Sequence, residues 1–182
     1  MRRSIVIAVI MSSGVFVRAL PVAAGPCWEP PVTAPVVDPF REPACPGCPG
    51  NRGVAYGTPA GDAIRAVAAG RVTFAGDVAG TAYVVVELAN GWRLTYGNLA
   101  DVRVRAGDPV VTGLPLGRTA GEFHFGLRDA ADVYRDPAPY LGTWRYRPRL
   151  IPLDAPAPPA PPPTLACLGP GRELGVSRGR GI

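Results

Sequence analysis

Glycine and proline interrupt this chain so often that long regular helices are excluded. The sequence has 23 of each among its 182 residues, and both residue types weaken or end helices. Between them lie short segments rich in β-branched and aromatic residues, several of which alternate between polar and apolar positions. These segments cover residues 64–69, 71–75, 81–88, 92–96, 102–104, 110–112 and 122–127. We therefore predict an all-β domain with an antiparallel sheet over residues 35–141.

Turn signals separate several of these segments. Asn90-Gly91 lies between two alternating segments and predicts a hairpin with a two-residue turn. Ala69-Gly70 and Gly107-Asp108-Pro109 indicate further turns. The spacing favours strands that are neighbours in sequence and in the sheet.

The first 24 residues have the features of a secretory signal. Arg2 and Arg3 precede an apolar run over residues 5–17, and small residues suited to cleavage end at Ala24. The run is shorter than the roughly 20 apolar residues that span a bilayer, and Arg18 follows it. We expect a secreted or cell-envelope protein, attached to a membrane only if the leader stays uncleaved.

Composition divides the rest of the chain into four parts. Residues 25–50 contain eight prolines and three of the four cysteines, which predicts an extended leading segment. Residues 51–141 form the expected β-sheet core domain, and residues 142–154 extend it. Residues 155–182 begin with a run rich in proline and end in a Gly/Arg-rich stretch, which predicts a stiff spacer and a disordered basic tail.

The net charge of +5 does not indicate nucleic-acid binding. All 19 basic residues are arginines, and the excess over 14 acidic residues lies in the leader and the tail. Residues 25–154 carry 13 arginines and 13 acidic residues. A neutral domain lacks the basic surface that nucleic acid requires, so we exclude that class of partner.

An even number of cysteines in an exported chain favours disulfides. Cys27, Cys45, Cys48 and Cys167 allow three pairings, and the sequence does not choose among them. The Cys-Pro-Gly-Cys motif is also compatible with half of a zinc site or a redox dithiol. We favour a disulfide that staples the proline-rich segment, because no second close pair of cysteines and no strand–helix unit accompany the motif.

Three short motifs follow one another in the expected β region, and each is similar to a motif of one known protein family. Residues 51–55, Asn-Arg-Gly-Val-Ala, lie where the family has His-x-Gly-Val/Ile-Asp. Residues 94–99, Leu-Thr-Tyr-Gly-Asn-Leu, lie where it has Thr-x-Tyr-x-His-Leu. Residues 122–128, Glu-Phe-His-Phe-Gly-Leu-Arg, replace His-Leu-His-Phe-Glu-x-Arg. Together the three motifs resemble the lysostaphin-type (LytM-type) zinc metallopeptidases, which cut peptidoglycan cross-bridges. The resemblance extends over residues 37–141 and implies a β-sheet core of the lysostaphin type.

The departures from the family fall on its zinc chemistry. The resemblance places the three zinc ligands at Asn51, Ala55 and His124, and the two assisting histidines at Asn98 and Glu122. His124 alone keeps the family residue. A catalytic zinc ion needs about three protein ligands from His, Cys, Asp or Glu, so we expect no zinc cofactor. An active metalloendopeptidase with atypical ligands is the alternative.

His124 has two interpretations. On an alternating strand it shares one face with Glu122, while Phe123 and Phe125 face the core. It is then either a structural histidine or part of a groove that still binds peptide or glycan, with Tyr56 and Tyr96 nearby.

We therefore predict a secreted domain that has lost its reaction. As in family members without zinc ligands, its role would be to bind peptidoglycan or to regulate a cell-wall hydrolase. A structural protein-interaction domain is the third hypothesis.

Overall fold

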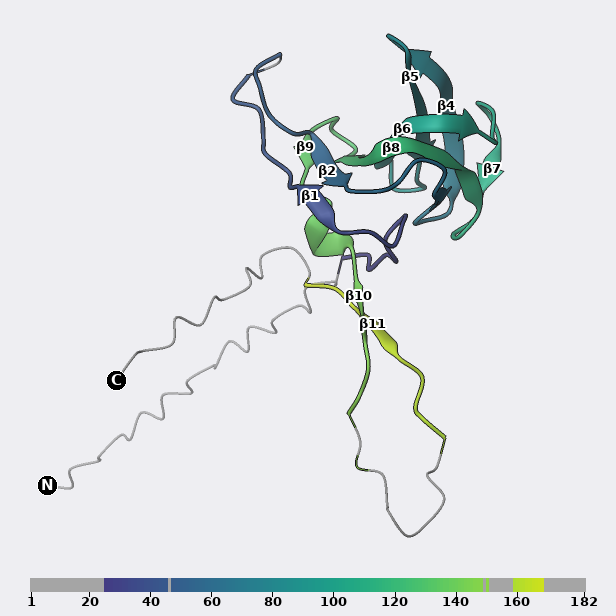
Figure 1. Ribbon diagram of the computed structural model, residues 1–182. Coiled ribbons are helices and arrows are strands. Elements are labelled where there is room, and N and C mark those ends of the chain that lie inside the picture. Colours follow the sequence, from purple (N-terminus) through teal and green to yellow (C-terminus); the bar gives the residue numbers. More distant parts are fainter. Residues whose placement is uncertain (1–24, 46, 149, 151–158, 169–182) are drawn as a thin grey trace, which may run out of the picture.

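The computed structural model describes residues 25–45, 47–148, 150 and 159–168 (Figure 1). The predicted secretory leader and most of the predicted tail lie outside the described residues. In the described part, no helix is long and apolar enough to cross a membrane.

The regular secondary structure of the described residues is almost entirely β-strand, which confirms the predicted fold class. The strands are β1 (Val36–Asp38), β2 (Gly53–Tyr56), β3 (Ala63–Arg65), β4 (Gly70–Val78), β5 (Thr81–Glu87), β6 (Arg93–Val102), β7 (Pro109–Val110), β8 (Pro115–Arg128), β9 (Tyr134–Arg135), β10 (Thr143–Arg145) and β11 (Thr164–Ala166). One short 3-10 helix, η1 (Ala138–Tyr140), precedes β10. β1 and β2 lie in segments for which the alternation pattern predicts no strand.

Nine strands form one antiparallel sheet in the order β1-β2-β8-β6-β5-β4-β7, with β3 and β9 also paired to β8 (Figure 1). The predicted hairpin at Asn90-Gly91 joins β5 to β6. Its turn is longer than predicted, because the Leu88 N–H donates to Trp92 O (2.8 Å) and leaves three residues between them. Gly91 takes the left-handed conformation that such a turn requires (φ +79°).

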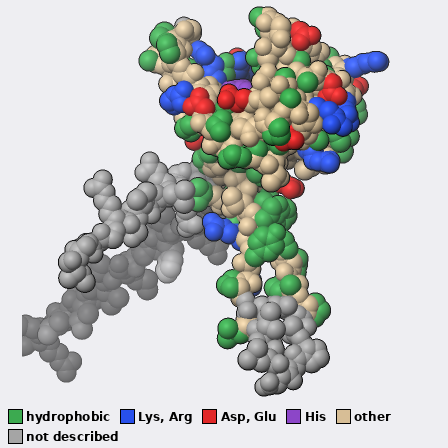
Figure 2. All heavy atoms as spheres, viewed as in Figure 1, with side chains coloured by type: hydrophobic (Ala, Val, Ile, Leu, Met, Phe, Trp, Pro, Cys, Tyr) green, Lys and Arg blue, Asp and Glu red, His purple; other side chains and the backbone are tan. Residues whose placement is uncertain are grey.

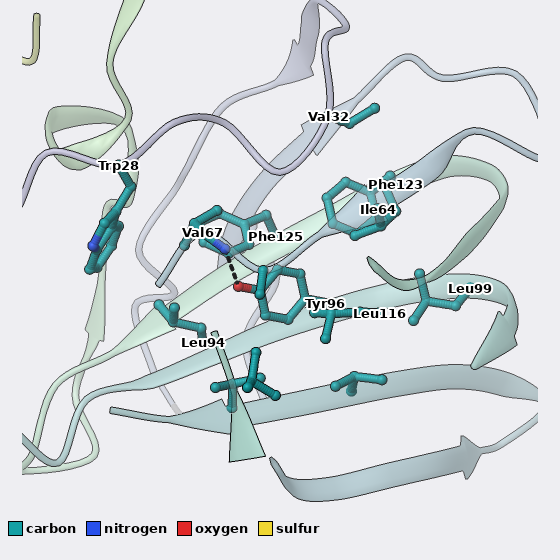
Figure 3. Packing of buried hydrophobic residues seen from close by; sticks show 14 of the residues in the cluster. Trp28, Val32, Ile64, Val67, Leu94, Tyr96, Leu99, Leu116, Phe123 and Phe125 are labelled. Atoms are coloured by element: carbon teal, nitrogen blue, oxygen red, sulfur yellow. Dashed lines mark hydrogen bonds between the residues drawn. The ribbon is translucent and has the colours of Figure 1, made fainter. Parts of the chain in front are cut away.

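The core lies on one face of this sheet. Phe123, Phe125 and Leu127 of β8 are fully buried, as their alternation predicts. The two phenylalanine rings pack against Tyr96 of β6 (Figure 3). The Tyr96 hydroxyl accepts a hydrogen bond from the Val67 N–H (3.1 Å), which satisfies its polar atom inside the core. The opposite face of β8 is left for His124 and its neighbours.

Two disulfides hold segments outside the core. Cys45 is bonded to Cys48 at the tip of a hairpin that Arg41 and Asn51 close with two backbone hydrogen bonds of 2.9 Å. Cys27 is bonded to Cys167, 140 residues away. This pairing confirms the interpretation as disulfides, and neither a zinc half-site nor a free dithiol remains.

The C-terminal part differs from the prediction at one place. Residues 164–166 were expected within a disordered tail, yet they form β11, which pairs with β10. The physical reason lies next to the strand, since the disulfide at Cys167 ties this segment to Cys27. The side chain of Leu165 also packs closely against Gly142, where a Cβ would come within 2.6 Å of Leu165 Cγ.

Candidate functional site

A groove crosses the sheet on the face opposite the core. It has a volume of about 380 Å³ around His124, and a second hollow of about 380 Å³ lies above β4 and β5. Tyr83, Thr95 and Arg128 line both hollows, so the two adjoin each other. We call this surface the His124 groove. The single histidine, in purple, lies in a depression between raised parts of the surface (Figure 2).

Small residues surround the His124 ring. Ala55 of β2 is its direct partner across the sheet, and Gly97 of β6 is its partner on the other side. A Cβ on Gly53 would come within 2.8 Å of His124 Cε1, and one on Gly126 within 3.5 Å of Nε2. The ring therefore occupies space that side chains on these glycines would fill.

His124 is half-buried, and its environment favours the neutral ring. Burial lowers the pKa of the imidazole, while the nearby carboxylates of Glu122 and Asp38 raise it and oppose that effect. Within the described residues, no protein group hydrogen-bonds to the ring nitrogens. Neutral imidazole has one donor and one acceptor nitrogen, so His124 can offer both to a molecule in the groove.

Asn51 lies beside this ring and has a structural role. Its side-chain Nδ2 donates to the carbonyl oxygens of Asp38 and Pro39 and to the Asp38 carboxylate, each at 3.1 Å. Its Oδ1 accepts a hydrogen bond from the Gly53 N–H at 3.3 Å. These contacts join the start of β2 to the segment after β1, and they occupy the amide oxygen that a metal ion would need.

Asn98 and Glu122 are joined across the sheet but, contrary to expectation, line neither hollow of the His124 groove. Asn98 lies at an irregularity in the pairing of β6 with β8 and has a left-handed backbone (φ +60°). Its Nδ2 donates to the backbone carbonyl of Glu122. The Glu122 side chain is exposed. These two residues lie close together, as their family positions imply, but their shared bond is structural.

The residues present do not fit a catalytic zinc ion. Ala55 has no ligand atom, the Asn51 amide is used by the backbone, and His124 is the one strong ligand at the three ligand positions. No group of three His, Cys, Asp or Glu residues in the described part of the chain is placed to hold a metal ion.

Tyr56 and Tyr96 do not line the His124 groove, contrary to expectation. Both side chains are on the core side of the sheet, at 3% and 0% exposure. Burial raises the pKa of Tyr56 to about 12 and raises that of Tyr96 further. Tyr56 instead borders a separate, mostly apolar hollow of about 520 Å³ beside β1. The alternation that buries Phe123 and Phe125 also buries these two tyrosines.

Sequence reasoning missed the arginines at one end of the groove. Arg52, Arg128 and Tyr134 line it together with His124. Arg52 and Arg128 belong to the first and last family motifs. Arg52 and Tyr134, however, are 82 positions apart in sequence and meet through the pairing of β9 with β8. A short strand of two residues carries no sequence signal that would reveal this contact.

Comparison with known proteins gives one family and several similar folds. Residues 49–133 match the model of peptidase family M23. The structure of Csd3 from Helicobacter pylori is similar with a TM-score of 0.58 and 28% identity. The match covers 65% of this chain but 36% of the Csd3 chain, so this chain spans about a third of that relative. No curated protein sequence gives a significant match.

Two further structures share the fold. A chain of the SpoIIQ–SpoIIIAH pore-forming complex has a TM-score of 0.54 and 22% identity, and the match covers 64% of this chain and 91% of that one. Lysostaphin in solution has a TM-score of 0.52 and 21% identity, with 59% and 49% covered. At these identities the likeness concerns the fold alone.

Proposed function

We propose, since residues 49–133 match the model of peptidase family M23, that this chain binds peptidoglycan in the His124 groove without cleaving it. The observation that carries the proposal is the state of the ligand positions. Ala55 has no ligand atom, and the Asn51 amide is held by Asp38 and Gly53. The groove itself remains open around His124.

The lining of the groove supports a binding role. Tyr83 offers an aromatic wall, Thr95 a hydroxyl, and His124 two ring nitrogens that no described residue occupies. Binding sites for small molecules and peptides combine apolar surface with a few polar groups of this kind. A side chain that had become purely structural would be expected to use its polar atoms within the protein.

An extracytoplasmic location is part of the proposal. The Cys27–Cys167 and Cys45–Cys48 disulfides support it, because disulfides persist in oxidising compartments. The secretory leader expected from the first 24 residues agrees with it.

Metal analysis separates this proposal from the enzyme alternative. The purified chain should contain far less than one zinc ion per molecule and should leave muropeptides uncleaved after prolonged incubation with added zinc. Stoichiometric zinc, together with muropeptide cleavage that disappears in His124→Ala, would contradict the proposal and favour an active metalloendopeptidase with unusual ligands.

Co-sedimentation with purified sacculi tests the binding itself. The chain should sediment with sacculi at moderate salt, and Tyr83→Ala should reduce the bound fraction because it removes one wall of the groove. Tyr146→Ala is the matched control, since Tyr146 is 76% exposed and lies outside the groove. Failure to sediment would remove the binding function and leave regulation of a cell-wall hydrolase as the remaining role.

A further inference from the structure

Arg52 is the charged side chain of the His124 groove with the fewest interactions with other described residues. Its guanidinium lies 5.5 Å from the centre of the Tyr134 ring and makes no ion pair or side-chain hydrogen bond with another described residue. It is half-buried beside Gly50 and His124. A planar group with five donors that is held by stacking alone is prepared to bind an anion.

The neighbouring charges leave this end of the groove positive. Asp132 is shared by two arginines, with its Oδ1 2.8 Å from Arg93 and 3.1 Å from Arg128. Arg128 also lies over Tyr134, at 4.4 Å from the ring centre, and donates to its hydroxyl. Arg93 and Arg128 therefore share one carboxylate, and Arg52 has no ion pair with a described acid.

The other nearby acids reduce this excess without cancelling it. Glu42 is exposed and borders a neighbouring hollow together with Arg52, without an ion pair between the two. Asp129 is paired with Arg135. Asp38 is bound by Arg41. Glu122 is exposed and lies six residues before Arg128 on β8, about 20 Å along an extended strand. His124 lies between the two on the same face, and because burial lowers its pKa, the ring adds little positive charge near neutral pH.

The second hollow of the groove is more apolar, although Arg93 and Arg128 also line it. Beyond Tyr83 and Thr95 it is lined by Phe74, Val78 and Val85 of β4 and β5. Phe74 is 38% exposed and Val78 is 54% exposed, so apolar surface is open to a ligand there. A ligand that matches both parts has an anionic end and small apolar groups a few ångströms away, as a short alanine-containing peptide does.

We propose that Arg52, supported by Arg128, binds the free C-terminal carboxylate of a peptide whose preceding residues lie along β5 and β6. This inference rests on the proposed function, because it takes the peptide to be a stem peptide of peptidoglycan. Arg52 forms a paired hydrogen bond to the two carboxylate oxygens, and Arg128 adds to the positive field. The domain would then favour stems with an uncapped end.

Calorimetric titration of the full chain with two muropeptides tests the site. One muropeptide ends in a free carboxylate, and the other is identical except for a C-terminal amide. The free acid should bind about tenfold or more tightly than the amide, the ratio expected for a charge-assisted hydrogen bond. Arg52→Gln should lower the affinity for the acid to that for the amide and leave the amide affinity unchanged.

Arg105→Gln is the control, because it removes the same charge from an exposed turn that lines no part of the groove. It should keep the preference for the acid. Equal affinity for the two muropeptides, or full preference in Arg52→Gln, would overturn the inference. So would competition by inorganic phosphate or polyphosphate that is stronger than competition by the free acid, since the site would then be one for phosphate.

The two proposals fail in different ways. Sedimentation with sacculi combined with equal binding of acid and amide would overturn the carboxylate site and leave peptidoglycan binding intact. Absence of binding to both sacculi and muropeptides would overturn both.

Discussion

Removal of the Cys27–Cys167 disulfide should destabilise the chain far more than removal of the Cys45–Cys48 disulfide. The two bonds close loops of very different size, with sequence separations of 140 and 3. A cross-link restricts the unfolded chain more when the loop is longer. The chain-entropy relation gives about 5 kcal/mol for the first and about 2 kcal/mol for the second at 25 °C.

Contacts around Trp28 give a reason to expect the full loss of about 5 kcal/mol when the Cys27–Cys167 disulfide is removed. Trp28, next to Cys27, is 7% exposed and stacks edge-on against Trp92. Its backbone N–H donates to Tyr140 O, and its carbonyl accepts from the Gly142 N–H, both at 2.8 Å. One end of the cross-link is therefore fixed to the domain by contacts other than the disulfide.

The assay compares the double variants Cys27→Ser/Cys167→Ser and Cys45→Ser/Cys48→Ser with the natural chain. Urea unfolding followed by tryptophan fluorescence reports on the region around Trp28. The free energy of unfolding should fall by about 5 and about 2 kcal/mol, respectively. Equal losses, or a loss below 1 kcal/mol for the long loop, would refute the reasoning and indicate that β11 detaches locally while the sheet stays folded.

Three further predictions follow from the site and its surroundings. Asn98→Ala should lower the free energy of unfolding by about 2–3 kcal/mol and Asn98→Gly by about 1 kcal/mol, measured by thermal or urea unfolding. Alanine loses both the side-chain hydrogen bond and the tolerance of φ +60°. Equal losses in the two variants would contradict this explanation. Burial raises the pKa of Tyr56 to about 12 from its ordinary value near 10. The contribution of its neutral side chain to the free energy of unfolding should therefore be fully present below pH 10 and be lost as the pH rises through 12. Tyr56→Phe should reduce that loss in alkaline denaturation curves, and an unchanged curve would show that Tyr56 does not titrate there. The double variant Asn51→His/Ala55→Asp should show a rise in melting temperature on addition of zinc that the natural chain lacks. The reason is that Ala55 is paired directly with His124 across the sheet. The same rise in melting temperature in the natural chain would contradict the proposed loss of zinc binding.

The alternation of single strands was the part of the fold that the sequence predicted best. Phe123 and Phe125 face the core and His124 faces the groove, because successive side chains in a strand point to opposite faces. The same rule, extended to β6, would have placed Tyr96 in the core beside Leu94. It would also have misplaced Asn98, whose left-handed backbone interrupts the alternation and turns its side chain toward β8.

Contacts between distant segments were beyond prediction. Arg52 meets Tyr134 because β9 returns to pair with β8, and neither residue lies in a pattern that predicts the other. The hydrogen bonds of Asn51 depend in the same way on the path of the chain after β1. A motif can therefore locate the position of a lost ligand, but its present role depends on the tertiary contacts.

His124 should give a distinct signal in the NMR spectrum of this protein. It is the single histidine among 182 residues, and its ring faces the groove between residues without bulky side chains. Its Hε1 proton should therefore give one isolated imidazole resonance in an unlabelled sample, with no second histidine to overlap it. The chain thus contains its own NMR reporter, whose chemical shift follows both the protonation of the ring and the occupancy of the groove by a ligand.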